Sequence, residues 1–426
     1  MNLKLLKNSL IYFVGTLIFS VFNYLFNAQM GQRLGPSEYS IIGSLLSLIV
    51  IITMPTNAVS TIIMRYAAHY QAQNQGGKIK AFAIHLTKRM AAVGVLIAII
   101  FALASSWIAD FLKLPSTTPV IIISPILAFL FVLPINRGLL QGLQRFFDSV
   151  INQNIDPLIK LILGLTLVSL GFGVNGAMVA ILIGTVIAYL GSFWPIRQLL
   201  KEPSQPIAHL PTEAKEYSWT AFLAFIFATL LLQIDVILVK HFLDAHTAGL
   251  YTALSTMAKI VLFVTTPVVS VMFPMISDLR GRDQKHYLIL MQSFLLVFAI
   301  GLVSCLGFYW FAPTVVNILY KAEFISVAPY LGLFGAAMLL YSLTNLWVNY
   351  FLSIGNRFFI VALGLITCLE IGLIWWRHDN FTVIINNLLL TNAMGFILLT
   401  GYYLYLKWPQ ILESWPTKLL PLHREP

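Results

Sequence analysis

Long apolar stretches recur along nearly the whole of this 426-residue chain, and short polar connections separate them. Apolar residues make up 59% of the chain and charged residues 10%, far from the balance of a soluble domain. Because a helix needs about 20 apolar residues to cross a bilayer, the chain has room for roughly twelve crossings and for no sizeable water-soluble domain. We therefore expect an all-α integral membrane protein with about twelve transmembrane helices.

The expected spans follow from the positions of these stretches. They lie near residues 9–30, 41–64, 90–109, 118–136, 154–171, 176–195, 218–239, 248–275, 289–311, 326–351, 357–376 and 382–406. Helices are required because lipid offers no hydrogen-bond partner to an open backbone, and the runs are too long and too uniformly apolar for barrel strands.

The net charge of +10 is explained by membrane orientation. With the N-terminus in the cytoplasm, 19 of the 26 Lys and Arg residues fall on the inner connections. Cytoplasmic loops collect basic residues, so we expect both termini inside. Nucleic acid is not needed to explain the charge.

Enzyme and metal chemistry find little support. Cys305 and Cys368 both lie within apolar runs, and the eight histidines show no ligand spacing, so we expect neither a disulfide nor a metal site. Every outer connection is short, the longest running from about Ala312 to Ile325. A membrane glycosyltransferase or polymerase would need a folded outer loop or grouped carboxylates, so we expect no enzyme.

An internal repeat divides the chain. At an offset of 212 residues, Gln144-Arg145-Phe146-Phe147 aligns with Asn356-Arg357-Phe358-Phe359, and Thr53 and Pro55 align with Thr265 and Pro267. An even number of spans separates the matches, which predicts two parallel six-helix repeats around a central cavity. The expected divisions are an N-terminal lobe over 1–196, a linker over 197–217, a C-terminal lobe over 218–408 and a tail over 409–426.

The eighth span carries a polar stripe at helical spacing. It comprises Thr252, Ser255, Thr256, Lys259, Thr266 and Ser270, and the second span carries a similar stripe that includes Ser44 and Ser47. We expect these faces to line the cavity, because a lysine about twelve residues into a span is costly to bury without water or a partner. The alternative is that the hydroxyls bond their own helix and Lys259 bonds a neighbouring carbonyl.

Other residues in the spans are also candidates. Pro55 and Pro267 interrupt corresponding spans and are candidate hinges or simple packing kinks. Asp235 and Glu370 are candidates for coupling to H⁺ or Na⁺, although Asp235 could instead pair with Lys259. Lys160 follows Asp156 by four residues, which favours an intrahelical ion pair.

Three segments carry a family resemblance. They are R-G-L-L-Q-G-L-Q-R-F-F from Arg137, Q-I-D-V-I-L-V-K-H-F-L-D-A-H-T-A-G-L-Y-T-A-L-S-T-M-A-K-I from Gln233, and Q-R-L-G-P-S-E-Y from Gln32. With them the chain resembles the polysaccharide flippases, of the O-antigen and capsule type, in the multidrug and toxic-compound extrusion (MATE-like, MOP) superfamily. The resemblance extends over essentially the whole chain.

The resemblance implies a function in the bacterial inner membrane. It implies that an oligosaccharide on a polyprenyl diphosphate carrier is flipped by alternating access for lipopolysaccharide or capsule biosynthesis, without a cofactor. Lys259, and Arg65 at the inner end of the second span, would then attract the diphosphate; alternatively, Arg65 anchors the membrane interface. Partners would be the lipid-linked oligosaccharide, membrane lipids and other polysaccharide-assembly proteins.

Two other transporter classes remain as alternatives. An ion-coupled multidrug exporter of the same superfamily fits less well, because the first span carries Asn23, Asn27 and Gln29 but no acid. A transporter of the major facilitator superfamily would have acidic and basic residues between the second and third spans. That connection contains no acid here.

Overall fold

The computed structural model describes residues 3–205, 212–281 and 286–414, and these residues form only helices and their connections. The α-helices are α1 (Leu3–Thr53), α2 (Thr56–Ala72), α3 (Gly76–Leu103), α4 (Ser105–Phe111), α5 (Thr118–Ile123), α6 (Ile126–Gly142), α7 (Phe146–Ser169), α8 (Gly173–Gly191), α9 (Phe193–Ile196), α10 (Thr212–Phe242), α11 (Ala245–Ala258), α12 (Ile260–Gly281), α13 (Tyr287–Leu319), α14 (Ala328–Ser353), α15 (Phe359–Trp376) and α16 (Phe381–Ser414). Two short 3₁₀ helices are η1 (Leu199–Lys201) and η2 (Ala322–Val327). The all-α prediction is confirmed.

Ten stretches of the described chain are long and apolar enough to cross a membrane. One of them, Ile11–Thr53, is 43 residues long and contains the first expected span and much of the second. Helix α7 is not among the ten, since Asp156, Lys160 and the polar run 152–154 reduce its apolar character. The exact count of twelve therefore stays a prediction.

Helix α1 changes direction at Gly35. This residue has φ 73° and ψ 172°, a conformation that a residue with a Cβ adopts only at a cost. Pro36 follows at the start of the second segment, where its missing N–H breaks no helical hydrogen bond. The Gly-Pro pair thus turns the chain back into the bundle, and we call this end of the bundle the Gly35 end.

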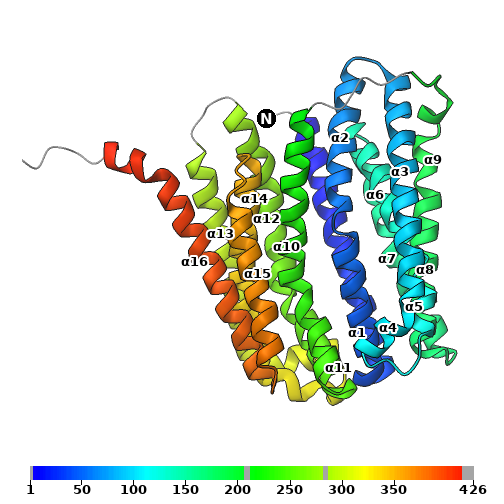
Figure 1. Cartoon of the computed structure of the whole chain (residues 1–426), viewed down its shortest axis with the longest axis vertical. Helices are drawn as coiled ribbons and strands as arrows, with labels where there is room; N and C mark the ends of the chain where they lie inside the picture. Colours follow the sequence, from blue (N-terminus) through cyan, green and yellow to red (C-terminus); the bar gives the residue numbers. More distant parts are fainter. Residues whose placement is uncertain (1–2, 206–211, 282–285, 415–426) are drawn as a thin grey trace, which may run out of the picture.

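The helices form two lobes that stand side by side (Figure 1). In the N-terminal lobe α7 packs on α8 and α1, and α6 packs on α2 and α3. In the C-terminal lobe α14 packs on α13, α16 and α12, and α15 packs on α10 and α16. Helices α1 and α10, which open the two lobes, both start at the end of the bundle where the chain begins, here called the amino end (Figure 1). The two halves are parallel, as the repeat predicted.

The lobe boundaries predicted at 1–196 and 218–408 stay predictions. Residues 206–211 of the expected linker and 415–426 of the expected tail lie outside the described residues.

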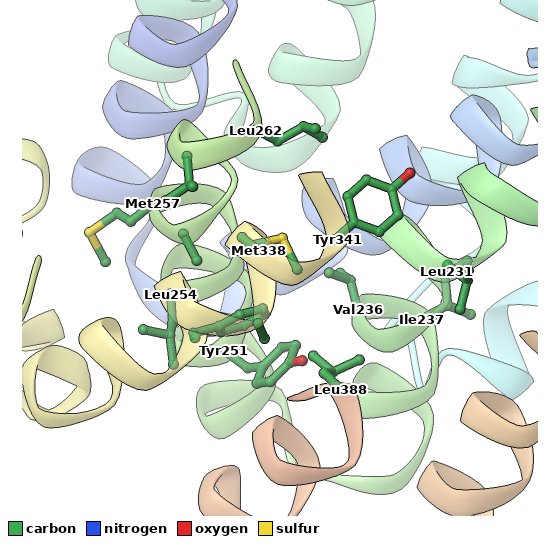
Figure 2. Close-up of a cluster of buried hydrophobic side chains, with 14 of the residues drawn as sticks. Leu231, Val236, Ile237, Tyr251, Leu254, Met257, Leu262, Met338, Tyr341 and Leu388 are labelled. Atoms are coloured by element: carbon green, nitrogen blue, oxygen red, sulfur yellow. The ribbon is translucent and has the colours of Figure 1, made fainter. Parts of the chain in front are cut away.

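The C-terminal lobe has a dense apolar core. Tyr251 and Met257 of α11 meet Met338 and Tyr341 of α14 and Leu388 of α16, as Figure 2 shows, and all five are nearly inaccessible. The Tyr341 hydroxyl donates to the Ala228 carbonyl of α10 at 2.7 Å. This core fixes α11 against α10 and so sets the position of the polar groups described below.

The lobes meet where the second segment of α1 packs on α11 and on α10. A Cβ built on Gly249 of α11 would lie 1.7 Å from the Pro36 carbonyl oxygen, and one built on Gly43 would lie 2.2 Å from Thr252 Cγ2. Small residues allow such close approach, which is the main source of helix association in lipid. We call this contact between α1, α10 and α11 the seam.

Gly249→Ala is expected to disturb the seam, because the atom its methyl group would meet belongs to the backbone and cannot rotate away. Overpacking of this kind costs about 1–3 kcal/mol. We expect the melting temperature of the purified protein in detergent to fall by several degrees. Gly372→Ala in α15 is the matched control, since a Cβ there meets nothing within 4 Å. Equal melting temperatures for the two variants would contradict the packing described here.

Candidate substrate site at the seam

A buried lysine joins the two lobes at the seam. Lys259 is only 8% exposed and lies between α11 and α12, and its Nζ donates to Gln233 Oε1 of α10 at 3.0 Å. Ser47 Oγ of α1 donates to the same oxygen at 3.2 Å. One amide oxygen of Gln233 therefore holds a hydroxyl from the N-terminal lobe and an ammonium from the C-terminal lobe.

Ser47 and Lys259 occupy equivalent positions of the two repeats, because they are 212 residues apart. Both therefore lie near the axis that relates the two halves, and they meet at a common acceptor. The serine and the lysine were both predicted to line the cavity, and the structure brings them together. Gln233 was not predicted, although it stands in the segment that carries the family resemblance.

Asp235 lies two residues beyond Gln233 and is 2% exposed. Its Oδ2 accepts hydrogen bonds from the Tyr251 hydroxyl at 2.9 Å and from Ser255 Oγ at 3.3 Å. Among the described residues no ion pair joins Asp235 to Lys259, so the direct pairing considered for them is not formed. Neutral hydroxyl donors hold the carboxylate instead.

Glu370 of α15 is fully buried nearby. Its Oε2 accepts from the Thr391 hydroxyl of α16 at 2.8 Å. Asp235, Glu370 and Lys259 lie close enough to interact electrostatically. One oxygen of each carboxylate, Asp235 Oδ1 and Glu370 Oε1, has no hydrogen-bond partner within the described protein. Such oxygens can accept a proton or contribute to holding a small cation.

Most of the other hydroxyls of the predicted stripes bond their own helix. Thr252 donates to the Ala248 carbonyl, Thr256 to that of Thr252, and Thr266 to that of Leu262, while Ser44 donates to the Ser40 carbonyl. Thr252, Ser255 and Ser44 are buried in the seam, whereas Thr266 is half-buried and Ser270 exposed. The hydroxyl alternative thus describes these residues in this conformation, and Ser47 and Ser255 are the two that bond other helices.

Arg65 lies apart from this group. It projects from α2 as an exposed side chain, and no described contact joins it to Lys259. The structure does not distinguish between a role in attracting substrate and one as an interfacial anchor.

The helix breaks only partly coincide with the prolines. Pro55 stands in the break between α1 and α2, and Pro267 lies inside a continuous α12. In the second repeat the break occurs at Lys259, eight residues before Pro267. Of the two candidate hinges only Pro55 coincides with an interruption, and hinge motion at either proline stays a prediction.

The seam is closed toward the Gly35 end. The Tyr39 hydroxyl of α1 lies 3.2 Å from the Tyr320 hydroxyl and 3.3 Å from Thr256 Oγ1. Nearby, Gln32 Nε2 donates to the Leu319 carbonyl at 3.0 Å. Because these bonds join the first repeat to the second, the lobes would have to separate here before the site could open toward this end.

The N-terminal lobe has a polar network of its own. The Lys160 ammonium donates to Asn23 Oδ1 of α1 and lies 5.2 Å from the centre of the Phe26 ring, while Asp156 Oδ1 accepts from Thr185 Oγ1 at 3.1 Å. Among the described residues no ion pair joins Asp156 to Lys160, so the predicted intrahelical pair is wrong. The lysine bonds the first span instead, because that span lies against the face of α7 that carries it.

Comparisons with known proteins agree with this architecture. The family model described as "Polysaccharide biosynthesis protein" matches residues 5–280. A comparison with curated protein sequences finds no match.

Solved transporters share the fold across nearly the whole chain. An inward-facing multidrug resistance MATE transporter of the MOP superfamily superposes with a TM-score of 0.77 at 13% identity, over 94% of this chain and 99% of that one. An outward-facing one gives 0.67 at 14% identity over 96% of each chain. A MOP superfamily transporter from Pyrococcus furiosus, described as having a binding pocket of reversed polarity, gives 0.66 at 15% identity over 95% of this chain and 96% of that one.

The family model covers well over half of the sequence, and the superpositions extend over both lobes. The chain therefore belongs to the polysaccharide biosynthesis protein family and has the fold of the MATE transporters of the MOP superfamily.

Proposed function

We propose that this protein flips an oligosaccharide linked to a polyprenyl diphosphate across the bacterial inner membrane, for the synthesis of a cell-surface polysaccharide. The observation that carries the proposal is Lys259, a cation buried at the seam and held by Gln233 and, through it, by Ser47. Membership of the polysaccharide biosynthesis family supports the substrate class. The protein acts as a transporter, and no bond of the substrate is made or broken.

A buried ammonium suits a diphosphate. Charge attraction is strong where the dielectric constant is low, and Lys259 is held by a neutral amide oxygen that a phosphate oxygen can replace. When the lobes separate at the amino end, the diphosphate binds Lys259 while the glycan occupies the polar space between the lobes. Breaking the Tyr39–Tyr320 contact then opens the other end, which completes alternating access.

Orientation follows from the distribution of charge. The amino end carries basic residues on several connections, among them Lys78, Lys80, Arg197, Lys201 and Arg280. The Gly35 end carries fewer, including Lys113 and Lys321. We place the amino end and both termini in the cytoplasm, in line with the preference of basic residues for that side.

Cation coupling is assigned to the second lobe. Asp235 and Glu370 are buried, interact with each other and with Lys259, and each has an oxygen without a partner in the described protein. A proton or Na⁺ bound there would offset their repulsion. Because Lys259 interacts with both carboxylates, cation binding would also change how strongly the lysine attracts a phosphate.

Multidrug export is the second candidate, since solved multidrug transporters share the fold. The first span argues against it. Asn23 and Asn27 stand there in place of an acid, and Asn23 accepts the Lys160 ammonium, so this part of the N-terminal lobe presents a positive charge that would repel cationic drugs.

Lys259→Met is expected to stop glycan transfer, because the diphosphate loses a charge-assisted contact of about 1.5–3 kcal/mol, which corresponds to about tenfold or more in rate. The assay follows a polyprenyl-diphosphate oligosaccharide in proteoliposomes as it becomes accessible to a membrane-impermeant oxidant. Lys321→Met removes an exposed lysine at the Gly35 end and serves as the control.

Two outcomes would contradict the proposal. If Lys259→Met transfers glycan like the control, the lysine has no part in translocation. If the wild type instead confers resistance to cationic dyes that is lost in Asp235→Asn, the protein is a drug exporter.

The coupling proposal predicts a ligand effect on stability. A cation that binds only the folded site raises the melting temperature, by an amount equivalent to about 2.7 kcal/mol at 100 times its dissociation constant. We expect the wild type to gain stability in NaCl relative to choline chloride, or on lowering the pH from 8 to 6. The double variant Asp235→Asn/Glu370→Gln is expected to lose that gain. Asp110→Asn, which removes an exposed acid on α4, is the control. A response retained in the double variant would exclude this site.

A further inference from the structure

A separate pocket opens at the amino end of the C-terminal lobe. Its volume is about 690 Å³, within the usual range of small-ligand sites. The walls come from the end of α12, the start of α13, the connection between α14 and α15, and the last part of α16. It lies away from the seam, on the side of the lobe formed by α13 and α16 (Figure 1).

The pocket is positively charged. Arg280 and Arg357 line it from two different elements, together with His286, and none of its described lining residues is acidic. His286 Nε2 lies 3.2 Å from the Tyr350 hydroxyl, and the Tyr350 ring stands edge-on to that of Tyr403, with centres 5.6 Å apart. The aromatic wall therefore fixes the place of the imidazole, and Arg280 interacts electrostatically with Tyr350 across the pocket.

The lining straddles the boundary of the membrane. Arg280, His286 and Arg357 lie just outside the apolar stretches of α12, α13, α14 and α15, whereas Tyr350 and Tyr403 lie inside theirs. Phe358, 76% exposed, stands at the rim. A ligand here would meet arginine at the water side and aromatic or aliphatic groups at the lipid side.

The repeat offers an internal comparison. Arg145 is the counterpart of Arg357 in the N-terminal lobe, and its guanidinium donates to Asp148 Oδ2 at 2.7 Å and to the Pro195 carbonyl. Ile360 stands at the position of Asp148, and Arg357 lines the pocket. The same arginine is thus used to close a helix end in one lobe and to line an open site in the other.

We propose that this pocket binds a phosphate group at the membrane surface through Arg280 and Arg357. Guanidinium groups recognise phosphate by paired hydrogen bonds, and basic pockets between membrane helices suit lipid headgroups. The phosphate belongs either to an anionic phospholipid of the surrounding bilayer or to a soluble phosphate compound. This inference does not depend on what the seam transports.

Native mass spectrometry of the full chain in detergent tests the proposal. The probes are phosphatidylglycerol, phosphatidylcholine of the same chain length, and inorganic pyrophosphate. We expect the wild type to retain one phosphatidylglycerol in preference to phosphatidylcholine. In Arg280→Gln/Arg357→Gln that retention falls by about tenfold or more, since two charge-assisted contacts are lost. Arg89→Gln, which removes an exposed arginine of the N-terminal lobe, retains the lipid.

The arms of the experiment separate the two sources of phosphate. Phosphatidylglycerol that pyrophosphate does not displace identifies a lipid headgroup, and pyrophosphate binding that is lost in the double variant identifies a soluble phosphate. Equal binding of every probe to the wild type and to a double variant with an unchanged melting temperature would overturn the proposal. Lys259→Met is expected to keep the pocket's binding, which separates this result from the transport assay.

Discussion

The close crossing of α1 and α11 holds the two halves of the molecule together. Between helices in lipid, the hydrophobic effect that drives association in water is absent, so close packing must supply the attraction. Gly249 allows the Pro36 carbonyl to approach, and Gly43 allows Thr252 to approach. The polar bridges of the seam, Ser47 with Gln233 and Tyr39 with Tyr320, form only because this contact brings the backbones near. A transporter that alternates must break this packing and form it again.

Burial of charge sets the second constraint. A lysine or carboxylate inside a membrane protein loses several kcal/mol of hydration, which partners must offset. Here the partners of Lys259 and Asp235 are mostly neutral groups, an amide oxygen and hydroxyls, and not a direct counter-ion. Neutral partners compete weakly with an incoming phosphate or cation. The arrangement therefore stabilises the closed protein without occupying the charge that a ligand would need.

Periodicity and charge predicted the fold well, but they predicted contacts less well. Apolar runs identify helices because lipid dictates their length, and the offset of 212 residues gave the parallel halves. Hydrophobicity fails at α7, whose polar residues face the lobe interior. The break at Lys259 was missed because the proline lies elsewhere in that helix. Gln233 and Thr391 were missed because their partners come from helices far along the chain.

The repeat explains why such contacts arise at particular places. Positions near the axis between the halves face their own counterparts, so Ser47 and Lys259 reach one acceptor from opposite lobes. A symmetric pair of lysines there would repel across a short distance in a medium of low dielectric constant. One hydroxyl and one ammonium avoid that repulsion and still leave a charge for the ligand. Arg145 and Arg357 differ in the same way, since one is neutralised by Asp148 and the other faces a pocket. A duplicated scaffold thus acquires function where its two copies diverge, and those divergent pairs are the places at which substitution separates transport from folding.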